Sequence, residues 1–378
     1  MLSQWLKLSR PYVITTGNRP GLIGHAYADA YYPADFSDKS AVLSLAKKLR
    51  IDAICACAND FGATTAAYVA EAMGLPGHDS YKTTLTLHHK HLFKAFAQAS
   101  GISTPDARWC SSKAAAYSIL ENMSLPLIVK PVDLTGGKGI TKVACAGDYR
   151  PAIDKAFTLS RAKTVVIEDF IRGSAHSFSA FVLNGKIVFY YSDNEYTYKN
   201  PFLITTSAGP ATGIHEVVAQ LIREAEHIVS LLALRDGILH IQYIHSEGKA
   251  WIIEVTRRCP GDFYPYPVSS AGGLDWAEWI VAAEAGADCF RFPRVRQNGF
   301  HGRHCIMSPR NGIVRAVEID RSLQNNIYDS FMMWSQGDVI EQYMTHKLGV
   351  LFLRYDSEEE MLEKSHNMTR LVRVELAY

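Results

Sequence analysis

The feature that most constrains this chain is the stretch from Leu125 to Val143, LPLIVKPVDLTGGKGITKV. An apolar run there ends in Lys130, and Pro131 prevents a helical continuation because proline lacks a backbone N–H. The glycine-rich segment Gly136-Gly137-Lys138-Gly139 follows, and a strand-like pattern resumes at Ile140. Two apolar runs separated by glycines predict a β-hairpin with a mobile glycine tip.

The chemistry of this glycine tip fits two interpretations equally well. Glycines let backbone N–H groups approach an anion closely, and Lys130 and Lys138 add positive charge, which together suit a lid over a polyphosphate. An ordinary glycine hairpin accounts for the same residues. The stretch is neither a GxxxxGK[ST] phosphate loop nor a GxGxxG dinucleotide turn, because neither spacing occurs in it.

Composition and charge exclude several classes of protein. The 378 residues allow two or three packed units, and 39 basic against 38 acidic residues provide no electrostatic footprint for nucleic acid. The seven cysteines form no CxxC pair, so they indicate neither a disulfide framework nor a zinc knuckle. We expect Cys55 and Cys57 to be buried apolar side chains of a strand. The absence of a long apolar run and of a signal-like N-terminus predicts a cytoplasmic protein with no membrane partner.

The N-terminal part alternates between strand-like and helix-like patterns. We expect strands and helices in the order strand 12–16, helix 40–49, strand 51–58 and helix 64–73. Short connections between such elements imply a small parallel sheet, and ligands bind beyond the carboxyl ends of its strands. Asn18 and Asp60 follow the two strands and are therefore placed at a cleft, although simple turn chemistry explains each of them equally well.

The rest of the chain reads as helices and antiparallel hairpins, with Asn184-Gly185 as a type I′ turn. Helices are expected over 87–100, from about 113, over 215–234, 275–285 and 358–369. Strands are expected over 164–167, 176–191, 238–244 and 250–255, with a strand-rich region from about 300. Lys90 and Lys94 lie four residues apart on the first of these helices, a spacing that usually marks a solvated face.

The second informative stretch is the hairpin that contains Gln242 and Glu254. These residues face each other across a short turn, and cross-strand neighbours lie about 5 Å apart. Thr256 and Arg258 point to the same side as Glu254 because side chains alternate along a strand. An amide oxygen, a carboxylate, a hydroxyl and a guanidinium would then converge, which suits a magnesium ion and a phosphate. A polar, solvent-facing hairpin edge is the competing interpretation.

The order of these residues along the chain resembles the ATP-grasp superfamily, in its carbamoyl-phosphate synthetase and biotin carboxylase-like branch. The residues that carry the resemblance are Lys90, Lys130, Glu168, Gln242, Glu254, Thr256 and Arg258. The resemblance implies an α/β (α+β) ATP-grasp architecture. A Rossmann-like pre-ATP-grasp domain would cover 1–85, two ATP-grasp lobes 86–290 with a mobile lid lobe at about 108–172, and a small β-rich module 291–378.

The resemblance also implies roles for individual residues. The groups expected to hold ATP are Lys90, Lys130, Gly136, Gly137, Gly139, Glu168, the backbone of Asp169 and Ile171, and, at the ribose, His176. Those expected at Mg²⁺ or Mn²⁺ are Gln242, Glu254 and Thr256. Those expected at the reacting groups are Arg258 and Lys138. The implied activity is a carboxylate–amine ligase that forms an acyl phosphate and releases ADP and phosphate, acting on small molecules and compatible with a homodimer.

Four positions depart from the superfamily pattern. Gln242 stands where an acid is usual, and Thr256 replaces the asparagine of Glu-x-Asn-x-Arg. Ala175 stands where an acid often contacts the ribose, and His89 replaces an aspartate before the first lysine. An ATP-binding protein that joins nothing is therefore the alternative hypothesis. The segment 262–267, rich in proline and tyrosine, is expected either to shape an acceptor pocket or to form a rigid turn.

Overall fold

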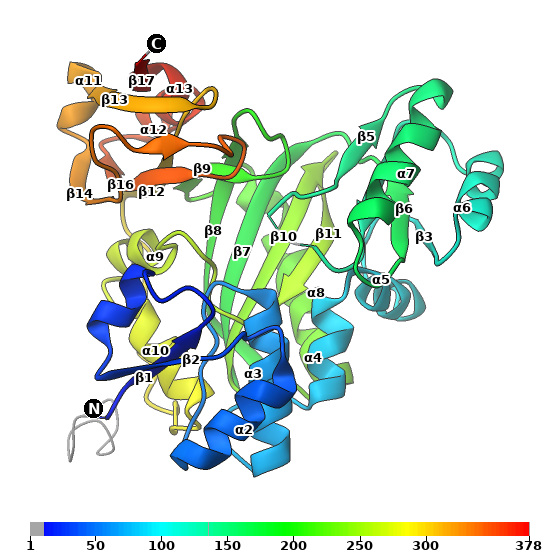
Figure 1. The fold of residues 1–378 in the computed structure, drawn as a ribbon, viewed down its shortest axis with the longest axis horizontal. Helices are drawn as coiled ribbons and strands as arrows, with labels where there is room; N and C mark the ends of the chain where they lie inside the picture. Colours follow the sequence, from blue (N-terminus) through cyan, green and yellow to red (C-terminus); the bar gives the residue numbers. More distant parts are fainter. Residues whose placement is uncertain (1–10, 135, 378) are drawn as a thin grey trace.

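The structure is a computed structural model that describes residues 11–134 and 136–377. Within these residues the strands form sheets of eight, four, three and two strands, and helices lie between and around them (Figure 1). No helix in the described ranges is long and apolar enough to cross a membrane. The mixture of helices and strands agrees with the α/β class expected from the sequence.

The largest sheet has the strand order β11-β10-β7-β8-β9-β12-β16-β14 and is antiparallel at every pairing. Its strands are β7 (Ser174–Leu183), β8 (Lys186–Thr197), β9 (Ile204–Gly209), β10 (Gly237–Ser246), β11 (Lys249–Thr256), β12 (Phe300–Met307), β14 (Ile327–Met332) and β16 (Lys347–Tyr355). Both predicted hairpins are confirmed. Asn184 and Gly185 have φ angles of 51° and 77°, as a type I′ turn requires, and Gln242 pairs directly with Glu254.

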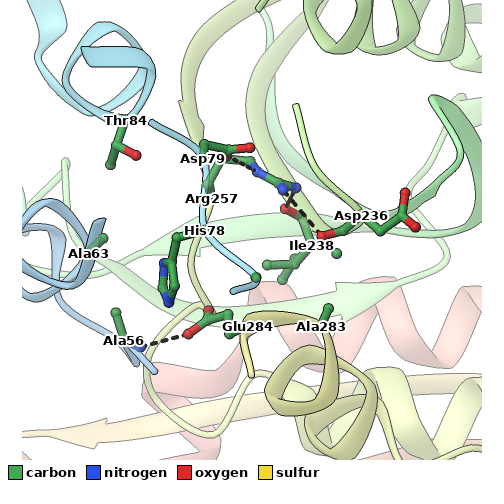
Figure 2. A pocket seen from close by; sticks show the side chains of 12 residues that line it. Ala56, Ala63, His78, Asp79, Thr84, Asp236, Ile238, Arg257, Ala283 and Glu284 are labelled. Atoms are coloured by element: carbon green, nitrogen blue, oxygen red, sulfur yellow. Dashed lines mark hydrogen bonds and ion pairs between the residues drawn. The ribbon is translucent and has the colours of Figure 1, made fainter. Parts of the chain in front are cut away.

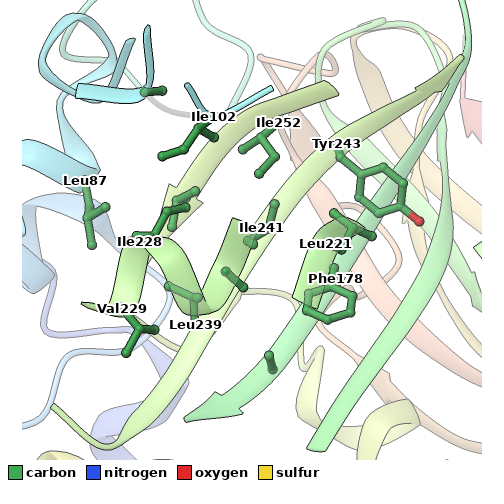
Figure 3. Packing of buried hydrophobic residues seen from close by; sticks show 14 of the residues in the cluster. Leu87, Ile102, Phe178, Leu221, Ile228, Val229, Leu239, Ile241, Tyr243 and Ile252 are labelled. Carbon is green, nitrogen blue, oxygen red and sulfur yellow. The ribbon is translucent and has the colours of Figure 1, made fainter. Parts of the chain in front are cut away.

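One face of this sheet is apolar, because apolar and polar side chains alternate along its strands and successive side chains point to opposite faces. Phe178 of β7 and Leu239, Ile241 and Tyr243 of β10 lie on this face and pack against helix α8 (Ile214–Leu232), which carries Leu221 and Ile228 (Figure 3). The opposite face is divided. Near Phe181 and Phe189 it packs against α9 (Pro265–Gly272) and α10 (Trp276–Glu284), and toward Gln242 it becomes polar.

A separate four-stranded sheet contains the glycine hairpin and lies on the right of Figure 1. Its order is β3-β6-β4-β5, with β3 (Ala107–Cys110), β4 (Leu127–Pro131), β5 (Thr141–Val143) and β6 (Val165–Asp169). Helices α6 (Lys113–Ile119) and α7 (Tyr149–Leu159) pack against it through a core of their own. The hairpin predicted from the sequence is the antiparallel pair β4–β5.

The N-terminal part differs from its prediction. The parallel pair consists of β1 (Ile14–Gly17) and β2 (Ala30–Pro33), and residues 51–58 form no strand apart from an isolated bridge between Cys57 and Cys259. This segment bonds to side chains and loops instead of a ladder: Ala56 donates to Glu284 and Ala58 to the Cys259 carbonyl. Its apolar composition therefore reflects packing, and Cys55 and Cys57 are exposed, not buried as expected.

Four helices of this part lead to the site: α2 (Lys39–Leu49), α3 (Asp60–Met73), α4 (Tyr81–His88) and α5 (Lys90–Ala99). The single helix expected over 87–100 is wrong at its start. The helical conformation is interrupted at His89, whose ψ of 115° is extended, so that α4 ends before this residue and α5 begins after it. Lys90 consequently becomes the first residue of α5. The remaining short helices, all 3₁₀, are Ile23–Tyr27, Leu120–Asn122 and Ala146–Asp148.

The C-terminal strands extend the large sheet. Strand β12 pairs with β9 and β16 pairs with both β12 and β14, while β13 (Gly312–Ile319), β15 (Val339–Ile340) and β17 (Val372–Ala377) form a small sheet above it. Helices α11 (Arg321–Gln324), α12 (Glu358–His366) and α13 (Met368–Leu371) complete this β-rich part. The domain boundaries at 85/86 and 290/291, and the lid limits at about 108–172, stay predictions.

Candidate active site

Helix α5 connects the glycine hairpin to the second informative hairpin. Lys90 Nζ lies 3.6 Å from Glu254 Oε2 on β11, and it donates to the carbonyl of Leu134 beside the glycine tip at 3.0 Å. Lys94 lies one helical turn further on the same side, because residues four apart are neighbours on a helix. One helix face therefore joins two hairpins that are more than a hundred residues apart in the chain.

Lys94 and Lys130 hold the carboxylate of Glu168 between them. Lys130 Nζ is 2.5 Å from Glu168 Oε1 and Lys94 Nζ is 3.0 Å from Oε2, with all three side chains at most 4% exposed. Burial opposes ionisation of Glu168, but the two ammonium groups outweigh it and lower its pKa to about 2. Burial lowers the pKa of Lys94 to about 8, and Thr104 accepts a 2.6 Å hydrogen bond from it.

Gln242 and Glu254 lie side by side on the polar face of the large sheet, as predicted. The Gln242 amide nitrogen donates to both carboxylate oxygens of Glu195 on β8, at 3.1 Å each. Burial, reinforced by the nearby Asp193 carboxylate, raises the pKa of Glu195 to about 8. A cation bound beside it would favour the ionised form.

Arg258 is held at the edge of this face by Asp60, the first residue of α3. Its Nε donates to Asp60 Oδ1 at 2.7 Å, and the same oxygen lies 3.2 Å from His88 Nδ1. Burial opposes ionisation of Asp60, yet its bonds to His88 and Arg258 hold its pKa well below the usual range. Asp60 therefore lies against Arg258, whereas Asn18 bonds Asp35 on an exposed surface, and the expectation that they lie at a ligand cleft stays a prediction.

The neighbouring Arg257 points the other way and stabilises the fold. Its Nε donates to Asp79 Oδ2 at 2.8 Å, and its other nitrogens donate to the carbonyls of Arg235 and Ile238. Figure 2 shows the contacts of Arg257 with Asp79 and Ile238 and the bond that Glu284 accepts from the Ala56 N–H. These residues line a cavity of about 20 Å³. A cavity of that size holds at most one water molecule, so it is a packing defect and not a ligand site.

The tip of the lid hairpin adopts a conformation that favours glycine. Gly136, Gly137 and Gly139 have φ angles of 64°, 71° and 75°. A Cβ on Gly137 would lie 2.5 Å from the Phe202 carbonyl oxygen in the turn after β8, so the tip rests closely on that turn. Lys138 is exposed. Its predicted role at the reacting groups stays a prediction, and Thr135 lies outside the described residues.

The end of β6 and the residues after it are expected from the resemblance to hold ATP. The Glu168 side chain is already bonded by two lysines, and the backbone N–H groups of Asp169 and Phe170 donate to the carbonyls of Asp106 and Pro126 at 2.9 Å and 3.1 Å. These two N–H groups are therefore not available to a ligand. The assignments of the Asp169 carbonyl and the Ile171 backbone stay predictions.

The expected contact of His176 with the ribose is not supported by the strand register. Ser177 pairs with Gln242 and shares its face, so the adjacent His176 points to the α8 side. There it stacks on Tyr243 with ring centroids 5.2 Å apart and contacts Ser174 Oγ at 2.6 Å. Burial lowers its pKa to about 4, which keeps the imidazole neutral. Alternation along β7 places His176 away from the cleft.

The oxygen donors fit a hard divalent cation. Glu254 supplies a carboxylate and Gln242 an amide oxygen from adjacent strands, whereas the Thr256 hydroxyl is buried without a partner among the described residues. Among the described residues, no group of three or more His, Cys, Asp or Glu side chains is placed so that it could hold a metal ion without other ligands. The remaining ligands would be phosphate oxygens and water, as is usual for Mg²⁺. Thr256 as a third ligand stays a prediction.

The sequence pattern does not predict the contacts that two residues of the site, Lys94 and Glu195, make in the structure. Lys94 was interpreted as part of a solvated face, but it is fully buried against Glu168. Glu195 was not singled out, although the polar run Ser192-Asp193-Asn194-Glu195 in an otherwise apolar hairpin is a signal that could have found it. Lys94 is far in sequence from Glu168, and Glu195 is far in sequence from Gln242, so only the fold shows these two contacts.

Comparisons with known proteins agree on one kind of domain. Residues 88–233 match the family described as phosphoribosylglycinamide synthetase, ATP-grasp (A) domain. A phosphoribosylamine–glycine ligase of Phenylobacterium zucineum is 30% identical over 177 residues, which cover 46% of this chain and 41% of that relative. The chain thus spans less than half the length of the curated relatives it matches.

Solved structures match nearly the whole chain in fold. An L-amino acid ligase from Bacillus licheniformis has a TM-score of 0.81 at 20% identity, covering 97% of this chain and 93% of that one. The biotin carboxylase domain of the Hydrogenobacter thermophilus 2-oxoglutarate carboxylase, in complex with MgADP and bicarbonate, has a TM-score of 0.76 at 15% identity, with 98% and 87% covered. These similarities identify the fold.

Proposed function

We propose that this chain, an ATP-grasp protein by its matched domain and by its fold, is an ATP-dependent ligase that joins a carboxylate to a nitrogen nucleophile and releases ADP and phosphate. The resemblance and architecture expected from the sequence are confirmed by the same comparisons. Two of the relatives are ligases by name, the phosphoribosylamine–glycine ligase and the L-amino acid ligase, which supports the class of reaction.

One observation carries the proposal: helix α5 brings the base of the glycine hairpin and the Gln242–Glu254 pair together. Lys90 contacts both sides, with Glu254 at 3.6 Å and the Leu134 carbonyl at 3.0 Å. A polyphosphate placed under the glycine tip would meet Lys90 and the N–H groups of the tip, and Lys130 lies at the base of the same hairpin. Its metal would meet Glu254 and Gln242.

The residues of the site suggest which group would assist each step of the reaction. Mg²⁺ or Mn²⁺ held by Glu254 and Gln242 would withdraw electron density from the γ-phosphate. A carboxylate oxygen of the substrate then attacks the γ-phosphorus, the bond to the ADP oxygen breaks, and an acyl phosphate forms. The nitrogen nucleophile attacks the acyl carbon, phosphate leaves with the bonding electrons, and the nitrogen loses a proton. Arg258, fixed by Asp60, would hold the carboxylate and the acyl phosphate.

The acceptor side of the cleft includes the segment that follows Arg258. Tyr264 is buried, and its hydroxyl lies 2.8 Å from Ser177 Oγ on the polar face of the sheet. Asp262 lies 2.5 Å from Lys347 and 3.6 Å from Arg303 on the C-terminal strands. These contacts support the interpretation of 262–267 as a wall of the acceptor pocket. We propose small-molecule carboxylate and amine substrates, and a homodimer stays a prediction.

A protein that binds ATP without joining substrates is the second candidate. Two features favour it: Gln242 stands in place of a carboxylate, and the Thr256 hydroxyl is buried. Glu254 is then the one carboxylate of the paired residues expected to bind the metal. Such a protein has no need of an arginine fixed at the cleft, so Arg258 favours the enzyme.

The experiment is a screen of small carboxylates and amines by phosphate release, with mass spectrometry of any product. We expect a defined pair of substrates to stimulate ADP and phosphate release. Glu254→Ala should lower this turnover by about 10²–10³-fold, because the metal interaction contributes several kcal/mol. Calorimetric binding of ATP with no turnover across the panel would support the second candidate, and unchanged turnover in Glu254→Ala would refute the metal assignment.

A further inference from the structure

Glu195 is the only described carboxylate that bonds the Gln242 side chain, and it lies on a strand that is not adjacent to β10. Gln242 pairs with Ser177 of β7, and Ser177 pairs with Asp193 of β8. Glu195 follows Asp193 by two residues and therefore points to the same face. The row from Glu254 through Gln242 thus continues across β7 to this second acidic residue.

The contact determines which end of the Gln242 amide faces the cleft. A cation bound at the site favours the ionised form of Glu195, which then only accepts hydrogen bonds, whereas an amide carries its donors on nitrogen alone. Rotating the amide by half a turn would place its oxygen against the two Glu195 oxygens, at the 3.1 Å now occupied by its nitrogen. The observed orientation is therefore the favourable one, and it leaves the amide oxygen on the side of Glu254.

We propose that Glu195 is a positioning residue for the metal: it fixes the Gln242 amide so that its oxygen, together with Glu254, faces the divalent cation of MgATP. This inference rests on the proposed function. It also assigns a purpose to an acidic side chain that has no lysine or arginine within ion-pairing distance in the described ranges.

The same arrangement restores charge at the site. Replacing the usual acid by Gln242 removes one negative charge beside the metal. When the bound cation keeps Glu195 ionised, this residue returns that charge one hydrogen bond further away, where it still stabilises the cation because the surroundings are partly buried. The site then combines a direct carboxylate, an oriented amide oxygen and an outer carboxylate, which resembles the way outer groups orient metal ligands in general.

The test exchanges the two side chains. Glu195→Gln removes the charge and the orientation, Gln242→Glu places an acid directly at the metal, and the double variant E195Q/Q242E exchanges the two residues without changing the total charge. Glu318→Gln, which removes an acid from an exposed ion pair with Arg373, is the matched control. Mn²⁺ binding is measured by electron paramagnetic resonance in the presence of a non-hydrolysable ATP analogue, and folding is checked by thermal unfolding.

We expect Glu195→Gln to weaken Mn²⁺ binding about 10–100-fold while analogue binding without metal stays the same, because outer groups contribute this much to metal affinity. The exchanged double variant should recover Mn²⁺ affinity to within about threefold, which a merely structural role for Glu195 would not produce. Glu318→Gln should bind Mn²⁺ as the wild type does.

Three results would overturn the proposal. The first is an Mn²⁺ affinity of Glu195→Gln that equals that of the control variant. The second is a double variant whose Mn²⁺ affinity is no higher than that of Glu195→Gln. The third is an unchanged metal affinity with a raised KM for the amine, which would assign Glu195 to the acceptor. A wild-type protein that binds neither Mn²⁺ nor the analogue would refute the proposed function itself, so the two failures can be told apart.

Discussion

The two ends of the candidate active site differ in how their acidic side chains are compensated. At one end Glu168 is buried between Lys94 and Lys130, and each ammonium lies within 3.0 Å of a carboxylate oxygen. At the other end, among the described residues, Glu254 has Lys90 as its ion-pair partner at 3.6 Å, and Glu195 accepts hydrogen bonds from the Gln242 amide but has no ion-pair partner within 4 Å. The first end is compensated by ion pairs within the protein, whereas the second end has fewer such pairs and burial raises the pKa of its Glu195.

The difference separates a permanent structural group from a site that is completed by a ligand. Removing one partner from a buried, compensated cluster leaves uncompensated charge behind, which is strongly destabilising. The acidic end behaves in the opposite way, because a bound cation there would relieve repulsion between carboxylates. Stability measurements should therefore report on the first end, and ligand-binding measurements on the second.

The largest expected effect is at the compensated end. Glu168→Ala leaves Lys94 and Lys130 buried without their carboxylate, and we expect the free energy of unfolding to fall by about 3–5 kcal/mol. Urea unfolding measures this loss. The matched variant is Glu254→Ala in the absence of nucleotide, whose partner Lys90 has an alternative acceptor, so a smaller loss is expected. An equal loss in both variants would contradict the comparison.

The same carboxylate makes a prediction about acid. Lys130 and Lys94, acting against burial, lower the pKa of Glu168 to about 2 from the ordinary 4.5, so between these values the unfolded chain binds the proton more readily. The stabilisation from Glu168 is therefore complete above about pH 4.5 and is lost as the pH falls toward 2. Urea unfolding between these limits should be less pH-dependent in Glu168→Gln than in the wild type; identical slopes would refute the assignment.

A third prediction compares two adjacent arginines. We expect Arg258→Lys to lower ligase turnover by about 100-fold, because lysine cannot reproduce a guanidinium that holds a carboxylate and Asp60 together. Arg257→Lys should instead lower the free energy of unfolding by about 1–3 kcal/mol, since Asp79 and two backbone carbonyls lose their donor. Steady-state phosphate release and urea unfolding measure the two effects, and the same loss of turnover in both variants would contradict the division.

The smallest effect concerns the lid tip. Gly137→Ala places a Cβ 2.5 Å from the Phe202 carbonyl in a backbone conformation that favours glycine, so the tip must withdraw from the turn after β8. We expect the KM for ATP to rise about tenfold, because a strain of about 1–3 kcal/mol is added to the closed lid. The free energy of unfolding should change by less than about 1 kcal/mol. Gly147→Ala, which meets no atom within 4 Å, is the control in the same lobe.

Local patterns were sufficient where neighbouring residues decide the geometry. The Asn184-Gly185 turn and the pairing of Gln242 with Glu254 follow from short loops and alternation, and the structure has both. The strand expected at 51–58 is wrong because apolar composition does not reveal whether a segment has a strand beside it. The helix break at His89 was missed for a related reason: its helical pattern continues on both sides.

By itself, the sequence determined the glycine hairpin, the hairpin that pairs Gln242 with Glu254, and the order of the expected site residues, because turns and alternation act over a few residues. Only the tertiary structure decided that Asp60 holds Arg258, that Lys94 shares Glu168 with Lys130 and that Glu195 orients Gln242. Each of these partners is separated by tens or hundreds of residues. Contacts at that separation depend on how strands and helices pack, and no local preference of the chain specifies them.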